Sequence, residues 1–273
     1  MHILVPTGGS THSHIALQQC LSIATDCEVE ATILSVIEHE DEAPGAEAIL
    51  AEAFAFLNLA INPLKTKIRL GNPDQEIVAE GESGSYDLII LGEKPAHGLF
   101  TRLMGPTVQR VIAQTGRPIL LAKQQAHALS RILICDGGAQ TPSLPDRLAD
   151  QLPELLEGAQ DVTILHVMSQ ISAAPGISGQ HLRAGAKELI TAQTPEGEWL
   201  ARDLETLEKV KVTATPKVRH GLVIEEILAE ASDGRYDLIA IGAHPQEGWQ
   251  RFLLEDVAAQ IILKAERPVL VIP

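Results

Sequence analysis

The stretch YDLIILG at residues 86–92 recurs as YDLIAIG at residues 236–242, with identical residues at five of the seven positions. The residue numbers of the two stretches differ by 150, and the same difference relates Gly71 to Gly221. It also relates the Arg-Pro pair at 117–118 to the one at 267–268. Because matches at one spacing extend over such a long part of the sequence, the chain is predicted to contain two copies of one structural unit.

The difference in residue number between the two copies is smaller at their first strands than in the later part of the sequence. ILV at residues 3–5 matches ILI at residues 132–134, a difference of 129. The second copy therefore carries about 21 extra residues, which we place around 169–195 and expect to form a surface excursion, since Gly, Ala, Ser and Gln dominate there. At 273 residues the chain is long enough for two domains, which we bound at 1–126 and 127–273.

Within each copy, short apolar runs alternate with segments of helical periodicity. In the first copy we expect strands at 3–6, 31–37, 65–70, 88–91 and 119–122, and helices at 10–24, 46–60, 73–82 and 106–114. Five strands alternating with four helices predict the α/β class, with a doubly wound five-stranded parallel sheet in each domain. Ligands of such sheets bind at the carboxyl ends of the strands, where the strand order reverses.

Composition narrows the classes of function. The formal net charge of −15 disfavours nucleic-acid binding, which needs clustered Lys and Arg. Apolar runs are strand-sized, so we expect neither a membrane span nor a secretory segment, and a cytoplasmic location. The cysteines at 20, 27 and 135 form no zinc or disulfide pattern, and we expect each to be a buried thiol.

The loop after the fourth strand of the first copy reads Gly92-Glu93-Lys94-Pro95, then nine residues, then Gly105-Pro106-Thr107. This pattern resembles the nucleotide-binding loop of universal stress proteins, in which Gly, two residues, Gly and nine residues precede Gly-Ser or Gly-Thr. The resemblance covers almost the whole chain, once in each copy. It implies the Rossmann-like fold shared with adenine nucleotide α-hydrolases.

The resemblance also implies a nucleotide site in the first copy. Small residues let the backbone approach phosphates, and the amides at a helix N-terminus bind the negative charge. The candidate residues are Pro6, Thr7, Gly8, Val36, Gly92, Lys94, His97, Gly98, Gly105, Pro106 and Thr107, and the implied cofactors are ATP and Mg²⁺. Pro95 and Pro106 depart from the family pattern, and Gly8 stands where the family has Asp. The alternative is that these glycines only shape turns between strand and helix.

The second copy departs further from the family pattern. Glu255-Asp256 stands where the first copy has Gly105-Pro106, and two carboxylates at a helix start repel a phosphate. We therefore predict that this copy does not bind ATP, and that Asp136 caps or shapes its turn. We expect the runs at 119–122 and 269–272 to pair in an internal pseudo-dimer, with association into homodimers through shared apolar faces.

The resulting prediction is a non-catalytic, stress-response binding and signalling protein with a protein partner still to be identified. One alternative is a slow ATP hydrolase or phosphotransfer enzyme, in which Glu93 would hold Mg²⁺. Another is a structural interaction protein with both clefts empty. A metal site at His12, His14 and His97 lacks a fixed geometry, so we interpret these as solvated or capping residues. Trp199 aligns with Ile49 and is interpreted as a packing residue.

Overall fold

The structure is a computed structural model that describes residues 1–93, 105–123, 126, 128–138, 140–169, 184–243 and 257–273. The first half contains strands β1 (His2–Pro6), β2 (Glu30–Ile37), β3 (Leu64–Leu70), β4 (Leu88–Gly92) and β5 (Ile119–Ala122). Its helices are α1 (Thr11–Ile23), η1 (Glu40–Glu42), α2 (Ala43–Leu57), α3 (Pro73–Ser83) and α4 (Pro106–Gln114). All five predicted strands are found with ends within one residue of the prediction, whereas α2 starts three residues earlier, because Pro44 favours its first turn.

The second half repeats this order with additions. Its strands are β6 (Arg131–Cys135), β7 (Asp161–Met168), β8 (Ala214–His220), β9 (Leu238–Gly242) and β10 (Val269–Ile272). Its helices are α5 (Leu144–Gln151), α6 (Pro153–Glu157), α7 (Ala186–Thr191), α8 (Pro195–Lys209), α9 (Val223–Asp233) and α10 (Val257–Lys264). Pro153 divides the counterpart of α1 into α5 and α6, because proline cannot continue the hydrogen-bond ladder of a helix.

The insertion in the second half is only partly the surface excursion that we predicted. Residues 186–191 form α7, which packs on α8. Leu189 of this helix is buried, and the carbonyl oxygen of the same residue approaches Gly197 so closely that a Cβ there would lie 2.1 Å away. This part of the insertion forms a helix because its apolar residues, at 186 and 189, repeat at helical spacing and can pack together on α8.

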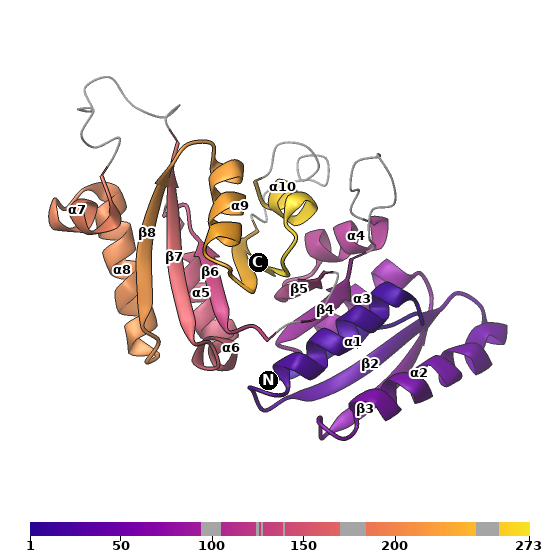
Figure 1. Cartoon of the computed structure of the whole chain (residues 1–273). Coiled ribbons are helices and arrows are strands. Elements are labelled where there is room, and N and C mark those ends of the chain that lie inside the picture. Colours follow the sequence, from indigo (N-terminus) through magenta and orange to yellow (C-terminus); the bar gives the residue numbers. More distant parts are fainter. Residues whose placement is uncertain (94–104, 124–125, 127, 139, 170–183, 244–256) are drawn as a thin grey trace.

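The ten strands form one sheet in the order β3-β2-β1-β4-β5-β10-β9-β6-β7-β8. Neighbours within each half are parallel, and the two halves join through antiparallel pairing of β5 with β10. Leu120 lies directly opposite Leu270, its own counterpart in the repeat, so the two halves are related by a pseudo-twofold axis at this pair. Figure 1 shows the two halves on either side of β5 and the C-terminus.

Successive residues of each strand supply two separate cores. Leu88 and Ile90 of β4 pack into a core with α1 and α2 and, in the second half, with α5, α6 and α8. Ile89 and Leu91 pack into a core on the opposite face with α3, α4, α9 and α10. The motif LIIL is therefore apolar without alternation because helices cover both faces of the sheet.

The Tyr and Asp that open the repeated motif have defined structural roles. Tyr86 donates a hydrogen bond of 2.8 Å to the buried carboxylate of Glu80 on α3, which also accepts from Lys67 and Arg69 on β3. The second half repeats this cluster with Tyr236, Glu230, Lys217 and Arg219. Asp87 accepts from the backbone N–H of His2 at 2.7 Å, which ties β4 to the start of β1.

These clusters predict a loss of stability in acid. Burial raises the pKa of Glu80 and of Glu230, but the hydrogen bonds from Lys, Tyr and Arg outweigh burial, so both pKa values end below normal. When the pKa of a carboxyl group is lower in the folded than in the unfolded state, its ionised form stabilises the fold. This stability is fully present at pH values above the unfolded pKa of about 4.3, and it is lost as the pH falls through the folded pKa. Glu80→Gln and Glu230→Gln should each lower the free energy of unfolding at pH 7.

Urea denaturation at pH 7 and pH 3 checks this prediction. The difference between variant and wild type should shrink at the lower pH. Glu52→Gln, at an exposed position of α2, is the control that should change neither value. A difference that is the same at both pH values would show that the two carboxylates do not carry the stabilisation.

Another ion pair, between Lys123 and Glu93, lies where the two halves meet. The Lys123 ammonium after β5 lies 2.7 Å from a carboxylate oxygen of Glu93 and donates to the carbonyl oxygen of Ile262 on α10. Lys123→Met would leave the Glu93 carboxylate buried without this cation, at a cost of about 3–5 kcal/mol in the free energy of unfolding. The double variant Glu93→Gln with Lys123→Met should recover most of that loss in urea denaturation. Equal losses in the single and double variants would exclude the ion pair as the cause.

Candidate functional site

The first half has a pocket at the carboxyl ends of β1 and β4, where the strand order reverses. Its volume is about 360 Å³. The structure brings together seven of the predicted site residues along its wall, namely Pro6, Thr7, Gly8, Val36, Gly92, Gly105 and Thr107. Pro106 is the first residue of α4 and does not line the pocket, whereas Lys94, His97 and Gly98 lie outside the described residues.

Two helix starts that the motif did not identify also reach this pocket. Ser10, His12 and Ser13 come from the N-terminus of α1, and the Ser10 hydroxyl caps that helix by accepting from the Ser13 N–H. Pro73 and Ile77 come from α3, whose cap is Asn72. The Asn72-Pro73 signal was visible in the sequence as a helix start, but only the fold places it beside the first strand.

The glycines of this pocket fall into two kinds. A Cβ on Gly92 would lie 1.8 Å from the carbonyl oxygen of His12, so this glycine allows α1 to approach β4. A Cβ on Gly8 or Gly105 would meet no atom of the described residues within 4 Å, and neither glycine has a left-handed φ. Packing and turn geometry therefore explain Gly92, but they do not explain Gly8 or Gly105, which leave open space in the pocket.

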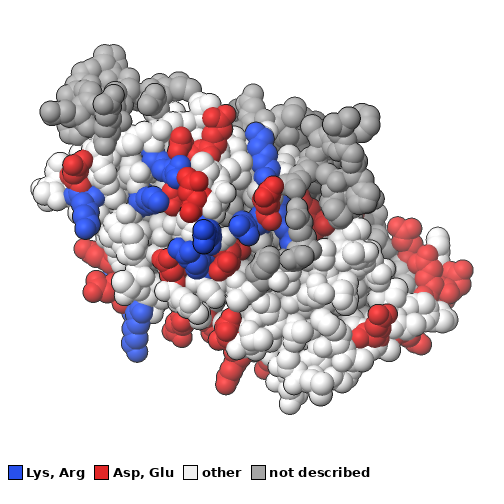
Figure 2. All heavy atoms as spheres, in the orientation of Figure 1, with Lys and Arg blue, Asp and Glu red and all other residues white. Residues whose placement is uncertain are grey.

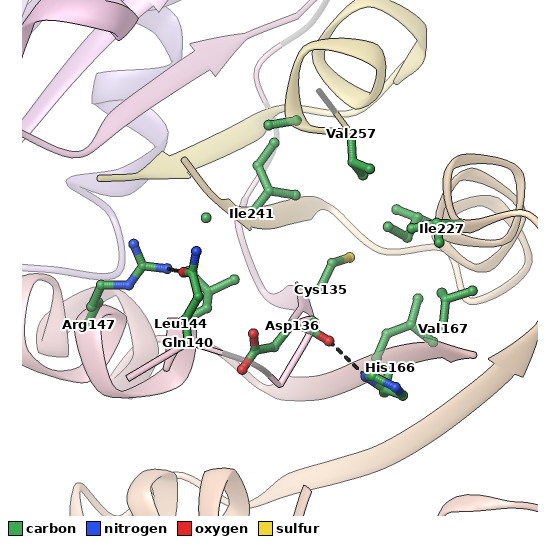
Figure 3. A pocket seen from close by; sticks show the side chains of 15 residues that line it. Cys135, Asp136, Gln140, Leu144, Arg147, His166, Val167, Ile227, Ile241 and Val257 are labelled. Atoms are coloured by element: carbon green, nitrogen blue, oxygen red, sulfur yellow. Dashed lines mark hydrogen bonds between the residues drawn. The ribbon is translucent and has the colours of Figure 1, made fainter. Parts of the chain in front are cut away.

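The second half has a pocket at the equivalent place, with a volume of about 330 Å³ (Figure 3). Asp136 replaces Thr7 at the end of the first strand, and Val257 replaces Thr107 at the start of the last helix. The Asp136 carboxylate accepts from the N–H of Gly138, as predicted for a residue that shapes the turn. The wall is otherwise mainly apolar, with Val167, Ile227 and Ile241 facing the same space.

Arg147 of α5 is a residue of this pocket that sequence reasoning missed. Its guanidinium donates to Gln140 and to the backbone oxygens of Ile272 and Pro273, and it lies where a Cβ on Gly242 would be. Burial lowers the pKa of Arg147, while the charge of Asp136 opposes that shift. The guanidinium therefore fixes α5 to the end of β10, and no motif in the sequence signals that contact.

Asp203 on α8 is a buried carboxyl group beside Asp136. Burial raises the pKa of Asp203 to about 6, the hydrogen bond from Arg202 opposes the shift, and the neighbouring Asp136 adds to it. Trp199 on the same helix packs against Gly138, as Ile49 packs against Gly9 in the first half. These matched contacts agree with the interpretation of Trp199 as a packing residue.

Metal ligands do not gather in the described part of the chain, where no group of three His, Cys, Asp or Glu residues could hold an ion. His12 lines the first pocket, and the ring of His14 instead contacts Phe56, with 5.1 Å between the centroids. His97 lies outside the described residues. Cys20 is buried as expected, whereas Cys27 and Cys135 are only partly buried. No helix in the described ranges is long and apolar enough to span a membrane.

Substitution by alanine should affect stability differently at the two kinds of glycine. Gly92→Ala should lower the free energy of unfolding by about 1–3 kcal/mol, because the new methyl group would displace α1. Gly8→Ala and Gly105→Ala should leave it within about 0.5 kcal/mol of wild type or raise it slightly. Thermal and urea denaturation of the three variants check this. A loss at Gly8 or Gly105 as large as that at Gly92 would show that the fold itself needs all three.

The comparisons with known proteins agree with the repeat. The model of the Universal stress protein family matches residues 1–123 and again residues 130–273. A universal stress protein from Synechocystis is 24% identical over 196 residues, a match that spans 70% of this chain and 59% of the relative. The crystal structure of a universal stress protein from Archaeoglobus fulgidus superposes with a TM-score of 0.72 at 18% identity, covering 99% of this chain and 97% of the other.

A protein of unknown function from Pseudomonas aeruginosa also shares the fold, with a TM-score of 0.69 at 17% identity. That match covers 99% of this chain and 92% of the other. The described strands and helices are α/β throughout, and the family model matches the two copies separately. The chain therefore belongs to the universal stress protein family and carries two domains of that family in tandem.

Proposed function

We propose that the chain is a stress-response protein that binds an adenine nucleotide, ATP above all, in the pocket of its first domain. The observation that carries the proposal is the pair Gly8 and Gly105. Both line the pocket, and no atom of the described residues lies within 4 Å of the point where a Cβ on either of them would stand. Glycine at such positions lets the backbone approach a ligand closely.

The surroundings of these glycines suit phosphate groups. The pocket lies where α4 begins, with the Thr107 hydroxyl on its wall, and the N-terminus of α3 lies beside it. Amides at a helix N-terminus and the helix dipole favour an anion. Val36 at the end of β2 gives an apolar contact for the base, in keeping with the position that the family resemblance implies. The residues present therefore fit an adenine nucleotide.

The second domain, in this proposal, binds no ATP and completes the sheet instead. Its pocket offers Val257 in place of the Thr107 hydroxyl and the Asp136 carboxylate in place of Thr7. A carboxylate at the strand end repels a triphosphate. Glu255 and Asp256, the acidic pair that first suggested this difference, lie outside the described residues.

Binding without catalysis is favoured over ATP hydrolysis by the contacts of Glu93. This carboxylate follows β4 directly and is the local candidate for holding Mg²⁺, but one of its oxygens lies 2.7 Å from the Lys123 ammonium. An ammonium at that distance neutralises the negative charge of the Glu93 carboxylate, which the carboxylate would need in order to bind Mg²⁺. We therefore place Mg²⁺, if it accompanies the nucleotide, on the phosphates rather than on this carboxylate.

Calorimetric titration of the full chain with ATP tests the site. Gly8→Val should weaken ATP binding by at least ~10-fold, equivalent to about 1.4 kcal/mol, because its side chain fills the pocket. Gly137→Val is the matched control at the equivalent position of the second domain, where a Cβ also meets no described atom within 4 Å, and it should bind ATP like wild type. Absence of ATP binding in wild type, or loss only in Gly137→Val, would contradict the proposal.

A second measurement separates binding from catalysis. Wild-type protein incubated with ATP and Mg²⁺ should form ADP no faster than the buffer does, as followed by phosphorus NMR. ADP formation that Gly8→Val abolishes would establish the hydrolase alternative in the same pocket.

A further inference from the structure

The outer edge of the first domain is an unpaired strand. β3 and β8 are the two edge strands of the ten-stranded sheet. The N–H of Ala31 donates to Pro63 and the N–H of Gly71 donates to Ile37, so odd-numbered residues of β3 direct their backbone groups toward β2. Backbone groups alternate along a parallel edge, and the even-numbered residues from 64 to 70 therefore direct theirs outward. No hydrogen bond to these outward groups occurs within the described part of the chain.

The other edge is protected. Pro216 of β8 is the counterpart of Thr66, and the bond from the Gly221 N–H to Met168 places residue 216 among the outward-directed positions. Proline has no N–H, so the central outward donor of β8 is missing, a known way to block strand addition. Helix α7 also contacts β8 (Figure 1). The His220 ring nitrogen Nε2 lies 3.0 Å from the carbonyl oxygen of Ala184. β3 has no proline among residues 64–70, and no described helix of the first domain corresponds to α7.

The helix beside the open edge exposes apolar side chains. Phe54 and Phe56 of α2 are each 37% exposed, and Leu59 just after it is 97% exposed. At the positions of Phe56 and Leu59 the second domain has Thr206 and Lys209. In Figure 2 the lower right, where α2 lies, is mostly white with scattered Asp and Glu atoms and a cluster of them at the right edge, whereas Lys and Arg mix with Asp and Glu over the second domain.

A groove of about 530 Å³ runs between α2 and β3. Glu47, Leu50, Ala51 and Phe54 line it from the helix, and Thr66, Lys67 and Ile68 line it from the strand. A strand placed against β3 would extend the sheet over this groove, and every second side chain of that strand would enter it. The part of the groove between Leu50, Phe54 and Ile68 favours apolar side chains at alternate positions.

The opposite face of the edge carries a row of cations. Lys65, Lys67 and Arg69 alternate along β3, and although Lys67 and Arg69 contact Glu80, the Lys67 side chain remains 47% exposed. Lys65 is exposed and has no ion pair among the described residues. Two copies of the chain that paired through β3 would place this row opposite itself, which like charges disfavour. Acidic side chains complement the row.

We propose that β3 accepts an extended segment of a partner protein whose side chains alternate between apolar and acidic. The backbone of the segment would pair with the outward groups of residues 64–70. Its apolar side chains would occupy the groove beside Phe54, and its acidic side chains would meet Lys65 and Lys67. Addition of a strand to an exposed sheet edge is an established mode of peptide recognition. The proposal does not depend on nucleotide binding, because none of the described residues that line the first pocket belongs to β3.

Fluorescence anisotropy with a labelled, end-capped peptide Glu-Val-Glu-Val-Glu-Val-Glu, as long as β3, tests the proposal. Wild type should bind it, Thr66→Pro should weaken binding at least ~10-fold, and Thr66→Ala should bind like wild type. Thr66→Pro copies a residue that the equivalent strand already tolerates, and thermal denaturation checks that it remains folded. Lys65→Glu should weaken binding of this peptide and strengthen binding of the Lys-Val-Lys-Val-Lys-Val-Lys peptide.

Three results would overturn the proposal. The first is no binding of the acidic peptide, and the second is equal binding by Thr66→Pro and Thr66→Ala. The third is a dimer of the chain in light scattering that Thr66→Pro abolishes, because it would show that a second copy occupies the edge.

Discussion

The fold depends on the pairing of β5 with β10. Parallel sheets occur almost only with both faces covered, and an exposed apolar edge strand is prone to pair with other chains. Each half alone would leave its last strand, a fully buried apolar run, as an open edge. Antiparallel pairing at Leu120 and Leu270 removes both edges at once and places the two halves about one pseudo-twofold axis. The buried contacts of Lys123 with Glu93 and with α10 reinforce the same junction.

Much of the architecture could be predicted because its signals are local and occur twice. The Tyr-Asp pair and the apolar run of the repeated motif each correspond to contacts that recur in both halves, from the Glu80 and Glu230 clusters to the buried faces of β4 and β9. Strand ends were accurate because Gly, Pro and polar residues bound each run. The α2 boundary and α7 were missed because their composition matched that of a loop.

The pocket could be predicted only in part, for a physical reason. Loop glycines can be read from a motif, but whether a glycine is required depends on what lies opposite it. Gly92 faces the backbone of α1, whereas Gly8 faces open space, and no sequence pattern separates the two. Arg147 was missed for the same reason, since its contact with the end of β10 joins segments far apart in the chain.

The duplication provides an internal comparison for each feature of the surface. Residues that both copies share, such as the buried Tyr-Glu-Arg clusters, are those that the fold requires of either half. Features found in one copy alone must have another origin. Among the described residues, the first copy has a pocket without Asp, Glu, Lys or Arg and an open edge beside exposed Phe54 and Phe56, whereas the second has Asp136 and Arg147 in its pocket and an edge closed by Pro216 and α7. Since the same fold tolerates both arrangements, stability does not dictate the open pocket and the open edge, and we attribute them to the proposed recognition of a nucleotide and of a partner segment.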